Sequence, residues 1–335
     1  MPNLRSLDLS KANDDGVPDW NSPIDPFGSF PNTLTSLHLS DIPLYPSFLK
    51  LRTLKELGLH YYEITATLDT ILNFVENNCS LESVAVAINF MNSPTNVSQR
   101  RAVIANRLRF LSVSSWDVAT ARTLISNIPL RTGAHLEIAL GNEEIESERD
   151  NILSGIPTAH LPNLSSPTFM GYKPFPREIQ LTGPNGSFSS HHSYSLETPF
   201  VEFSVLPLTS IRELRLIDSD LYTMFDPSYF PALKVLTFDY VIGVPHFFSA
   251  LLSDPSVFPS LGTLGFLNCE ITEELMGEFT RFASGRKNTT SAWLHHVIIV
   301  HKDGMFPSAA SIYGLERHVS VVDVGFGTNL PTDLT

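Results

Sequence analysis

The sequence predicts an α/β fold in which short parallel strands stack side by side into a solenoid shaped like a horseshoe. The parallel sheet is expected on the concave side, with helices and turns on the convex side. Two observations lead to this prediction. An apolar spacing of the form L-x-x-L-x-L recurs along the chain, and several segments between these strands carry apolar residues at helical spacing. One such unit cannot bury its apolar side alone, so it requires stacked copies.

The clearest unit covers residues 261–271 and fills every anchor of the leucine-rich-repeat pattern L-x-x-L-x-L-x-x-N/C-x-L. Leu264 and Phe266 point to one side of the expected strand, because side chains alternate between the two faces. Cys269 takes the turn anchor, where a small side chain can bond backbone groups. Asn89 takes the same position in an earlier unit. We therefore expect Cys269 and Asn89 to be buried and bonded to turn backbone.

Nine segments share the anchor spacing, and most steps between them match the repeat lengths typical of this class. Their first anchors are Leu4, Leu34, Leu54, Leu81, Leu108, Ile211, Leu233, Leu261 and Leu294. Helices are predicted between them at 68–75, 118–128, 245–252 and 273–282, the last with Thr272 as its N-cap.

The anchor spacing is interrupted between Leu108 and Ile211. Weak strand patterns occur there at 136–140, 178–181 and 200–205. An acidic stretch at 141–150 predicts a surface helix, and segments rich in Pro, Gly, Ser and His at 157–176 and 183–194 predict loops. We therefore expect a single domain over 1–335 with an irregular, loop-rich insertion at about 141–200.

The composition argues against several functional classes. A net charge of −13 without a basic run disfavours nucleic acid or an anionic membrane as the partner. No apolar stretch approaches the roughly 18 residues of a spanning helix, and residues 1–5 lack the apolar block of a signal peptide. Two cysteines, Cys79 and Cys269, are too few for a disulfide framework. We expect a cytoplasmic or nuclear protein, and we interpret its five Asn-x-Ser/Thr sequons as chance occurrences.

Residues able to act in catalysis or metal binding are present, but their arrangement favours structural roles. Adjacent histidines in an expected loop, or histidines on opposite faces of an expected strand, chelate one metal poorly. Aspartates in an expected turn and a cysteine at a buried anchor are poor candidates for acid/base or nucleophile roles. The residues considered are His191, His192, Asp218, Asp220, Cys269, His295, His296 and His301. We expect no enzymatic activity, no cofactor and no metal.

Strand openings of the form P-x-L-x-x-L-x-L begin at Pro2, Pro231 and Pro259. They resemble the repeat region of fungal F-box/leucine-rich-repeat proteins, especially the basidiomycete set. The tail is similar too, with a short helix at 308–317, a strand at 319–324 and a closing segment at 330–335.

In that family an N-terminal F-box helix bundle docks a Skp-type adaptor of a cullin ubiquitin ligase, and the repeats hold the substrate. No Leu-Pro-rich F-box segment precedes the first repeat of this sequence. The resemblance therefore implies an adaptor only if an F-box lies upstream, and we expect Met1 to mark an internal start, a fragment or a truncated gene model.

The predicted function is a non-enzymatic protein-protein interaction scaffold, as the substrate-recognition region of an F-box-like ubiquitin-ligase receptor. The alternative is a free-standing leucine-rich-repeat binding or inhibitor protein without a ubiquitin role. A secreted β-solenoid enzyme acting on polysaccharide is disfavoured by the helical segments between strands and by the lack of a signal peptide.

Residues between the anchors should point out of the concave face and are free to contact a partner protein. Towards the N-terminus they are small and polar: Ser6, Asp8, Ser36, His38, Glu56, His60 and Ser83. Towards the C-terminus several are apolar, and either they grip an apolar partner segment or the tail strand or a loop covers them. The predicted protein-binding residues are Glu213, Arg215, Val235, Thr237, Leu267, Ile298 and Val300.

Overall fold

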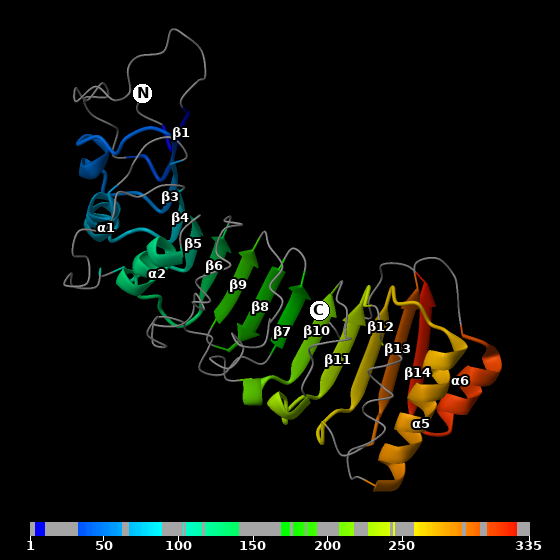
Figure 1. The fold of residues 1–335 in the computed structure, drawn as a ribbon. Helices are drawn as coiled ribbons and strands as arrows, with labels where there is room; N and C mark the ends of the chain where they lie inside the picture. The colour runs from blue at the N-terminus through cyan, green and yellow to red at the C-terminus, as the bar shows by residue number, and fades with distance from the viewer. Residues whose placement is uncertain are drawn as a thin grey trace. The chain divides into compact units, whose positions relative to one another are not determined.

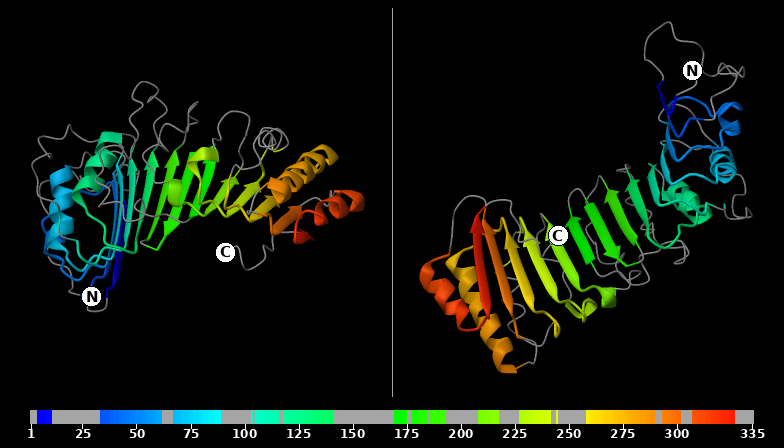
Figure 2. Two further views of the ribbon diagram at one scale, coloured as in Figure 1. Left: turned by 90° about the horizontal axis from the view of Figure 1, so that it is seen from below. Right: turned by 180° about the vertical axis from the view of Figure 1, so that it is seen from behind.

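The chain forms two compact units, each with an open and mostly parallel sheet (Figures 1 and 2). Unit 1 comprises Met1–Ser165 and Pro184–Tyr194, and unit 2 comprises Ser166–Gly183 and Ser195–Thr335. Neighbour-only packing allows a solenoid to divide in this way, so the single domain over 1–335 stays a prediction. The structure, a computed structural model, describes residues 4–10, 33–61, 67–88, 103, 105–115, 118–140, 169–174, 177–184, 186–192, 208–217, 227–241, 244, 258–289, 293–301 and 307–326.

The strands of unit 1 all run parallel, in the order β1-β2-β3-β4-β5-β6-β9. Their bounds are β1 Ser6–Ser10, β2 Ser36–Ser40, β3 Glu56–Tyr61, β4 Ser83–Ile88, β5 Phe110–Ser115, β6 Ala134–Leu140 and β9 Gly186–His192. The connections include η1 (Phe48–Lys50), α1 (Leu68–Asn77) and α2 (Val118–Asn127). Both α-helices lie on one side of this sheet (Figure 2). We call that side of each sheet the helix face and the opposite side the open face.

The strands of unit 2 follow the order β8-β7-β10-β11-β12-β13-β14. Their bounds are β7 Phe169–Pro174, β8 Arg177–Gly183, β10 Glu213–Ile217, β11 Val235–Asp239, β12 Thr263–Leu267, β13 His296–His301 and β14 Val321–Phe326. Its described helices are η4 (Leu208–Ser210), η5 (Pro227–Tyr229), α5 (Glu273–Thr289) and α6 (Ala309–Glu316). Figure 1 shows α5 and α6 side by side next to β13 and β14.

One strand pair departs from the predicted parallel arrangement, because β7 and β8 are antiparallel. Only residues 175 and 176 separate them, whereas a parallel pair needs a crossover of about a dozen residues or more. The expected loops at 157–176 and 183–194 are also wrong in part, because they contain β7 and β9. Buried Met170 and Phe188 anchor these strands in their sheets, so packing outweighs the weak strand propensity of their Gly and Ser residues.

The predicted helices are confirmed wherever the structure describes them. In α1 the residues Leu68, Ile71, Leu72 and Val75 are all buried. Thr272 caps α5, accepting a hydrogen bond from the backbone N–H of Leu275 at 3.1 Å. The expected helices at 141–150 and 245–252 and the expected strand at 200–205 lie outside the described residues.

The first anchor of each segment with the anchor spacing is buried on the helix face of its sheet. After Leu4, which is half-buried, those in the described residues are 2% exposed or less. They are Leu34, Leu54, Leu81, Leu108, Ile211, Leu233, Leu261 and Leu294. The anchor spacing therefore locates the inner wall of both units.

The same backbone hydrogen bonds recur at the start of successive strands. The carbonyl of Thr35, just before β2, accepts hydrogen bonds from two consecutive N–H groups at the start of β3. These are the N–H groups of Lys55, at 2.8 Å, and Glu56, at 3.0 Å. The carbonyls that accept two N–H groups in the same way belong to Arg5, Lys55, Glu82, Arg212, Lys234 and Gly262. This shared bond pattern holds neighbouring units in one register.

The strand ends repeat a second feature. Asp41, Tyr240 and Asn268 each follow a strand directly and adopt a positive φ of 52–54°. The N–H of Asn268, for example, donates to the carbonyl of Val300 on the next strand at 2.8 Å. The next residue is buried in each case: Ile42, Val241 and Cys269. The left-handed residue thus turns the chain so that the turn anchor points back inward.

Candidate protein-binding face

The seven predicted protein-binding residues all lie on the open face of unit 2, on strands β10 to β13. Glu213 is exposed, and Arg215 and Val235 are half-buried. The other four are nearly inaccessible: Thr237 at 7%, Leu267 at 3%, Ile298 at 2% and Val300 at 7% exposure.

The apolar residues of this face belong to a buried cluster of Leu267, Ile298 and Val300. An open apolar surface of this kind is costly in water, and of the two explanations offered for it the exposures support coverage by other parts of the chain. These three side chains are buried and form no open apolar surface. Only Glu213, Arg215 and Val235 of the predicted set are accessible.

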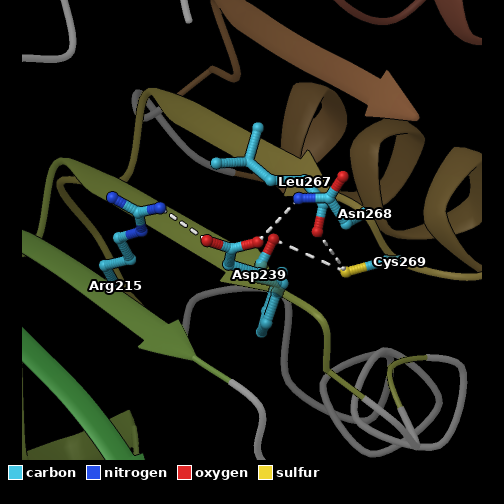
Figure 3. A network of polar contacts seen from close by, with 6 residues as sticks. Arg215, Asp239, Leu267, Asn268 and Cys269 are labelled. Carbon is cyan, nitrogen blue, oxygen red and sulfur yellow. Dashed lines mark hydrogen bonds and ion pairs between the residues drawn. The ribbon is translucent and has the colours of Figure 1, made fainter. Parts of the chain in front are cut away.

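A polar network joins the middle of β10 to the ends of β11 and β12 beside this cluster (Figure 3). The buried carboxylate of Asp239 accepts a hydrogen bond from Arg215 Nη2 at 2.5 Å and from Asn268 Nδ2 at 3.0 Å. Asn268 is the left-handed residue after β12. Two donors compensate the buried carboxylate, so the network ties three successive strands together rather than presenting a free acid.

Cys269 sits at the base of the same turn and confirms the prediction made for it. It is 1% exposed, and its Sγ donates to the carbonyls of Phe238 at 3.5 Å and Leu267 at 3.4 Å (Figure 3). Burial is the main reason that the pKa of the Cys269 thiol rises to about 11. A nucleophilic role is disfavoured in this setting. Asn89 lies outside the described residues.

The two cysteines should differ sharply in reactivity. At pH 8 Cys269 remains a buried thiol below its pKa of about 11, whereas Cys79 is exposed. We expect iodoacetamide to label Cys79 alone in the folded protein and both residues in urea, as read by peptide mass spectrometry. Equal labelling of both in the folded protein would contradict the buried anchor.

The open face of unit 1 differs in character from that of unit 2. Serine is its most frequent residue, and its described positions contain no Lys, Arg, Leu, Ile or Val. The positions predicted from sequence are exposed or half-buried here. Its ionisable side chains are Asp8, His38, Glu56, His60, His135, Glu137 and His191. This face is polar and accessible.

A group of polar side chains on β6 and β9 was not predicted from the sequence. The ring of His135 stacks on Phe110 at 5.2 Å, and its Nδ1 lies 2.5 Å from Ser187 Oγ. His191 Nε2 lies 3.8 Å from Glu137 Oε1. His191 and His192 were expected in a loop, but they end β9. Continuing the strand alternation through 135–139 would have revealed His135 and Glu137, whereas the pairing of β6 with β9 is a long-range property.

Burial lowers the pKa of His135; Glu137 opposes the shift and His191 adds to it. The lowered pKa means that the folded state resists protonation, so unfolding takes up a proton between the ordinary value of 6.5 and the lowered one. Stability linked to His135 is thus fully present above the ordinary value and falls as the pH drops through this window.

Replacing His135 by Gln should therefore reduce the acid sensitivity of unit 1. The amide can still bond the seryl hydroxyls but does not titrate. We expect urea midpoints to fall less between pH 7.5 and 5 in His135→Gln than in the wild type. His295→Gln, at an exposed position of unit 2, is the matched control. A wild-type-like pH dependence in His135→Gln would contradict the linkage.

Where the structure describes their side chains, the other candidate site residues are not brought together. His296 Nε2 lies 2.7 Å from Asp323 Oδ2, whereas the ring of His295 lies 6.3 Å from that of Trp293. Asp218 and Asp220 lie outside the described residues. Within the described ranges, no group of three or more His, Cys, Asp or Glu side chains is placed to hold a metal ion.

The sequon at Asn78 is inaccessible to a glycosylating enzyme in the folded chain. Asn78 is buried, and its Nδ2 donates to the carbonyl of Phe74 at 2.9 Å. The interpretation of this sequon as a chance occurrence agrees with its placement.

No known protein-family model matches this sequence, and no curated protein matches it. Among the described helices, none is long and apolar enough to cross a membrane.

Proposed function

We propose that this chain is a leucine-rich-repeat solenoid that acts as a non-enzymatic protein-binding scaffold. The main support for the proposal is that the two faces of the unit 1 sheet differ in burial and polarity. The packing anchors lie on the helix face, while the open face presents accessible polar side chains. Such side chains can contact a partner without disturbing the core.

The repeat assignment is supported by three features that recur with the anchor spacing. These are buried first anchors, a carbonyl that accepts two N–H groups from the next unit, and a left-handed residue followed by a buried turn anchor. Cys269 fills the Cys/Asn position of the repeat pattern at such a turn.

The more specific role rests on the resemblance to fungal F-box/leucine-rich-repeat proteins. In this proposal the repeats are the substrate-recognition region of an F-box-like ubiquitin-ligase receptor, and a Skp-type adaptor is a partner only if an F-box segment belongs to the same protein. The alternative is a free-standing binding or inhibitor scaffold with the same face and no ubiquitin role.

Affinity purification of the product of the complete gene from its own cells tests both versions. Ser36→Arg with Ser83→Arg places two bulky side chains on the open face of unit 1, and Asn106→Arg on the exposed turn before β5 is the control. A receptor should co-purify with a Skp-type adaptor, and its partner should accumulate when cullin activity is blocked.

A partner lost only in the double variant, without adaptor or cullin dependence, would favour the free-standing scaffold. If the folded double variant retains every partner of the control, the open face of unit 1 is not the binding surface.

A further inference from the structure

We propose that the open face of unit 1 binds a cationic, extended segment of its partner protein and that protonation of the histidines on this face weakens the binding. The inference rests on the proposed function, and it adds the chemistry of the partner and a pH control to it.

The open face of unit 1 carries carboxylates and no Lys or Arg side chain at its described positions. Asp8 and Glu56 are exposed, and Glu137 is about one-third exposed. Their strands are β1, β3 and β6, and no Lys or Arg occurs at the described open-face positions of unit 1. Carboxylates on such a face attract Lys and Arg side chains of a partner and repel acidic ones.

Basic residues do border the face, at the positions just before the strands. Lys55 there forms an ion pair with Glu82 at 3.3 Å, so this pair contributes little net charge. Arg5 and Arg109 precede β1 and β5, and their carbonyls accept bonds from the next strand. These residues mark the edge that the acidic side chains of a partner would meet.

The spacing of the three carboxylates across the strands matches that of side chains along an extended segment. Neighbouring strands lie about 4.8 Å apart, so Asp8 and Glu56 are separated across the sheet by roughly 10 Å and Glu56 and Glu137 by roughly 14 Å. An extended segment advances about 3.3 Å per residue. A segment that crosses the strands would therefore meet these carboxylates with basic residues roughly three to five positions apart.

The side chains between the carboxylates leave room for such a segment. On β4 and β5 the half-buried open-face residues include Ser83, Ala85, Ser112 and Ser114. None of these four extends beyond a hydroxyl or a methyl group, and Phe110, which stacks on His135, is the one large open-face side chain of these two strands. A backbone that crosses beside Phe110 can therefore approach the sheet and bond to the serines.

Four histidines lie on the same face as the carboxylates. His191 lies 3.8 Å from Glu137 and competes for that carboxylate once it is protonated. His38 lies across Gly58, where an added Cβ would collide with its ring. His60 lies on the same strand as Glu56, and His135 lies beside Glu137 and His191.

Protonation of these four rings would outweigh the three carboxylates. Histidine is the side chain whose charge changes between about pH 5 and 8, so acidification turns a negative face into a positive one. Burial lowers the pKa of His135, so this ring needs a lower pH than an ordinary histidine to add its positive charge. A cationic partner segment is then repelled.

Binding of synthetic peptides to the full chain tests the proposal by fluorescence anisotropy. The probe carries three Lys residues spaced by three to five positions in a Gly/Ser background, and matched peptides carry Gln or Glu instead. We expect the Lys peptide to bind at pH 7.5 at least about tenfold more tightly than the Gln peptide, since several exposed ion pairs act together. The Glu peptide should bind most weakly, and the Lys peptide should weaken about tenfold at pH 5.5.

Two sets of variants assign the effect to this face. Glu56→Gln with Glu137→Gln should weaken the Lys peptide about tenfold at pH 7.5. Glu270→Gln with Glu274→Gln removes the same charge at exposed positions of unit 2 and should have no effect. Replacing His38, His60, His135 and His191 together by Gln should reduce the pH dependence of binding, read as the ratio of the Lys-peptide affinities of this variant at pH 7.5 and pH 5.5.

Equal binding of the Lys and Gln peptides would overturn the proposal. Equal weakening in both Glu→Gln pairs would also overturn it, because the net charge of the whole chain would then explain the attraction. If spermine displaces the labelled Lys peptide as well as the unlabelled peptide does, the face binds polyamines in general and the proposed specificity for an extended protein segment is wrong.

The cellular partner separates this inference from the proposed function. If that partner is lost with Ser36→Arg and Ser83→Arg but retained with Glu56→Gln and Glu137→Gln, the binding face stands and its cationic specificity fails. If neither pair affects the partner, both proposals fail.

Discussion

Replacing Leu267 and Ile298 together by Ser is expected to cost unit 2 most of its stability. Both side chains are nearly inaccessible on the open face and belong to one cluster with Val300. Removing each from an apolar core costs about 2–5 kcal/mol, and a buried hydroxyl without a partner adds about 1–3 kcal/mol. The two sites touch the same cluster, so we expect a total of roughly 4–8 kcal/mol rather than a strict sum.

This change should lower the urea midpoint and increase hydrogen exchange in β12 and β13. Val321→Ser is the matched control, because Val321 lies on the same face but is 48% exposed; it should stay within about 0.5 kcal/mol of wild type. The two single variants keep the test informative if the double variant does not fold. Wild-type stability of the singles would return the C-terminal open face to candidacy as an accessible apolar surface.

Replacing Arg286 by Met is expected to be the next most damaging change. Arg286 lies in α5, is 0% exposed, and its Nη2 donates to the carbonyls of Phe258 at 3.0 Å and Leu261 at 3.1 Å. The guanidinium therefore holds α5 against the turn at Phe258 and Leu261, just before β12. Hydrogen bonds from a charged donor contribute about 1.5–3 kcal/mol each, and we expect a net loss of about 2–4 kcal/mol after the desolvation of the guanidinium is relieved.

Lys287→Met is the control for Arg286→Met, since Lys287 is exposed and its Nζ bonds the carbonyl of Arg317 from the surface. Urea unfolding of both variants should show a large loss for Arg286→Met and less than about 1 kcal/mol for Lys287→Met. An apolar side chain can also replace a buried ion without loss, and a neutral result for Arg286→Met would show that the two carbonyls do not depend on it.

The nine strands that carry the anchor spacing, the side of each that is buried, and three of the helices follow from the sequence by itself. Leu264 and Phe266 alternate with outward residues, and this period of two decides which side of β12 is buried whatever lies next to it. The same local logic placed Cys269 at the turn anchor and the apolar stripe on α1, because burial of one face is the main force that orders each element. The polar character of the open face at Ser36 and Glu56 could be read in the same way.

Other features were decided only by the tertiary structure. Pairing of β6 with β9 is a contact between segments far apart in the chain, and it brings His135 next to Ser187, which lies in a segment expected to be a loop. Burial of Leu267 and Ile298 depends on what lies over the open face, which no alternation pattern encodes. Arg286 looks like an ordinary basic residue near a helix end, yet it is buried because two carbonyls of the turn before β12, those of Phe258 and Leu261, satisfy its donors. The sequence determines which face of each strand turns inward, because that choice is local, whereas partners across long separations are selected by packing and hydrogen bonding of the assembled sheet.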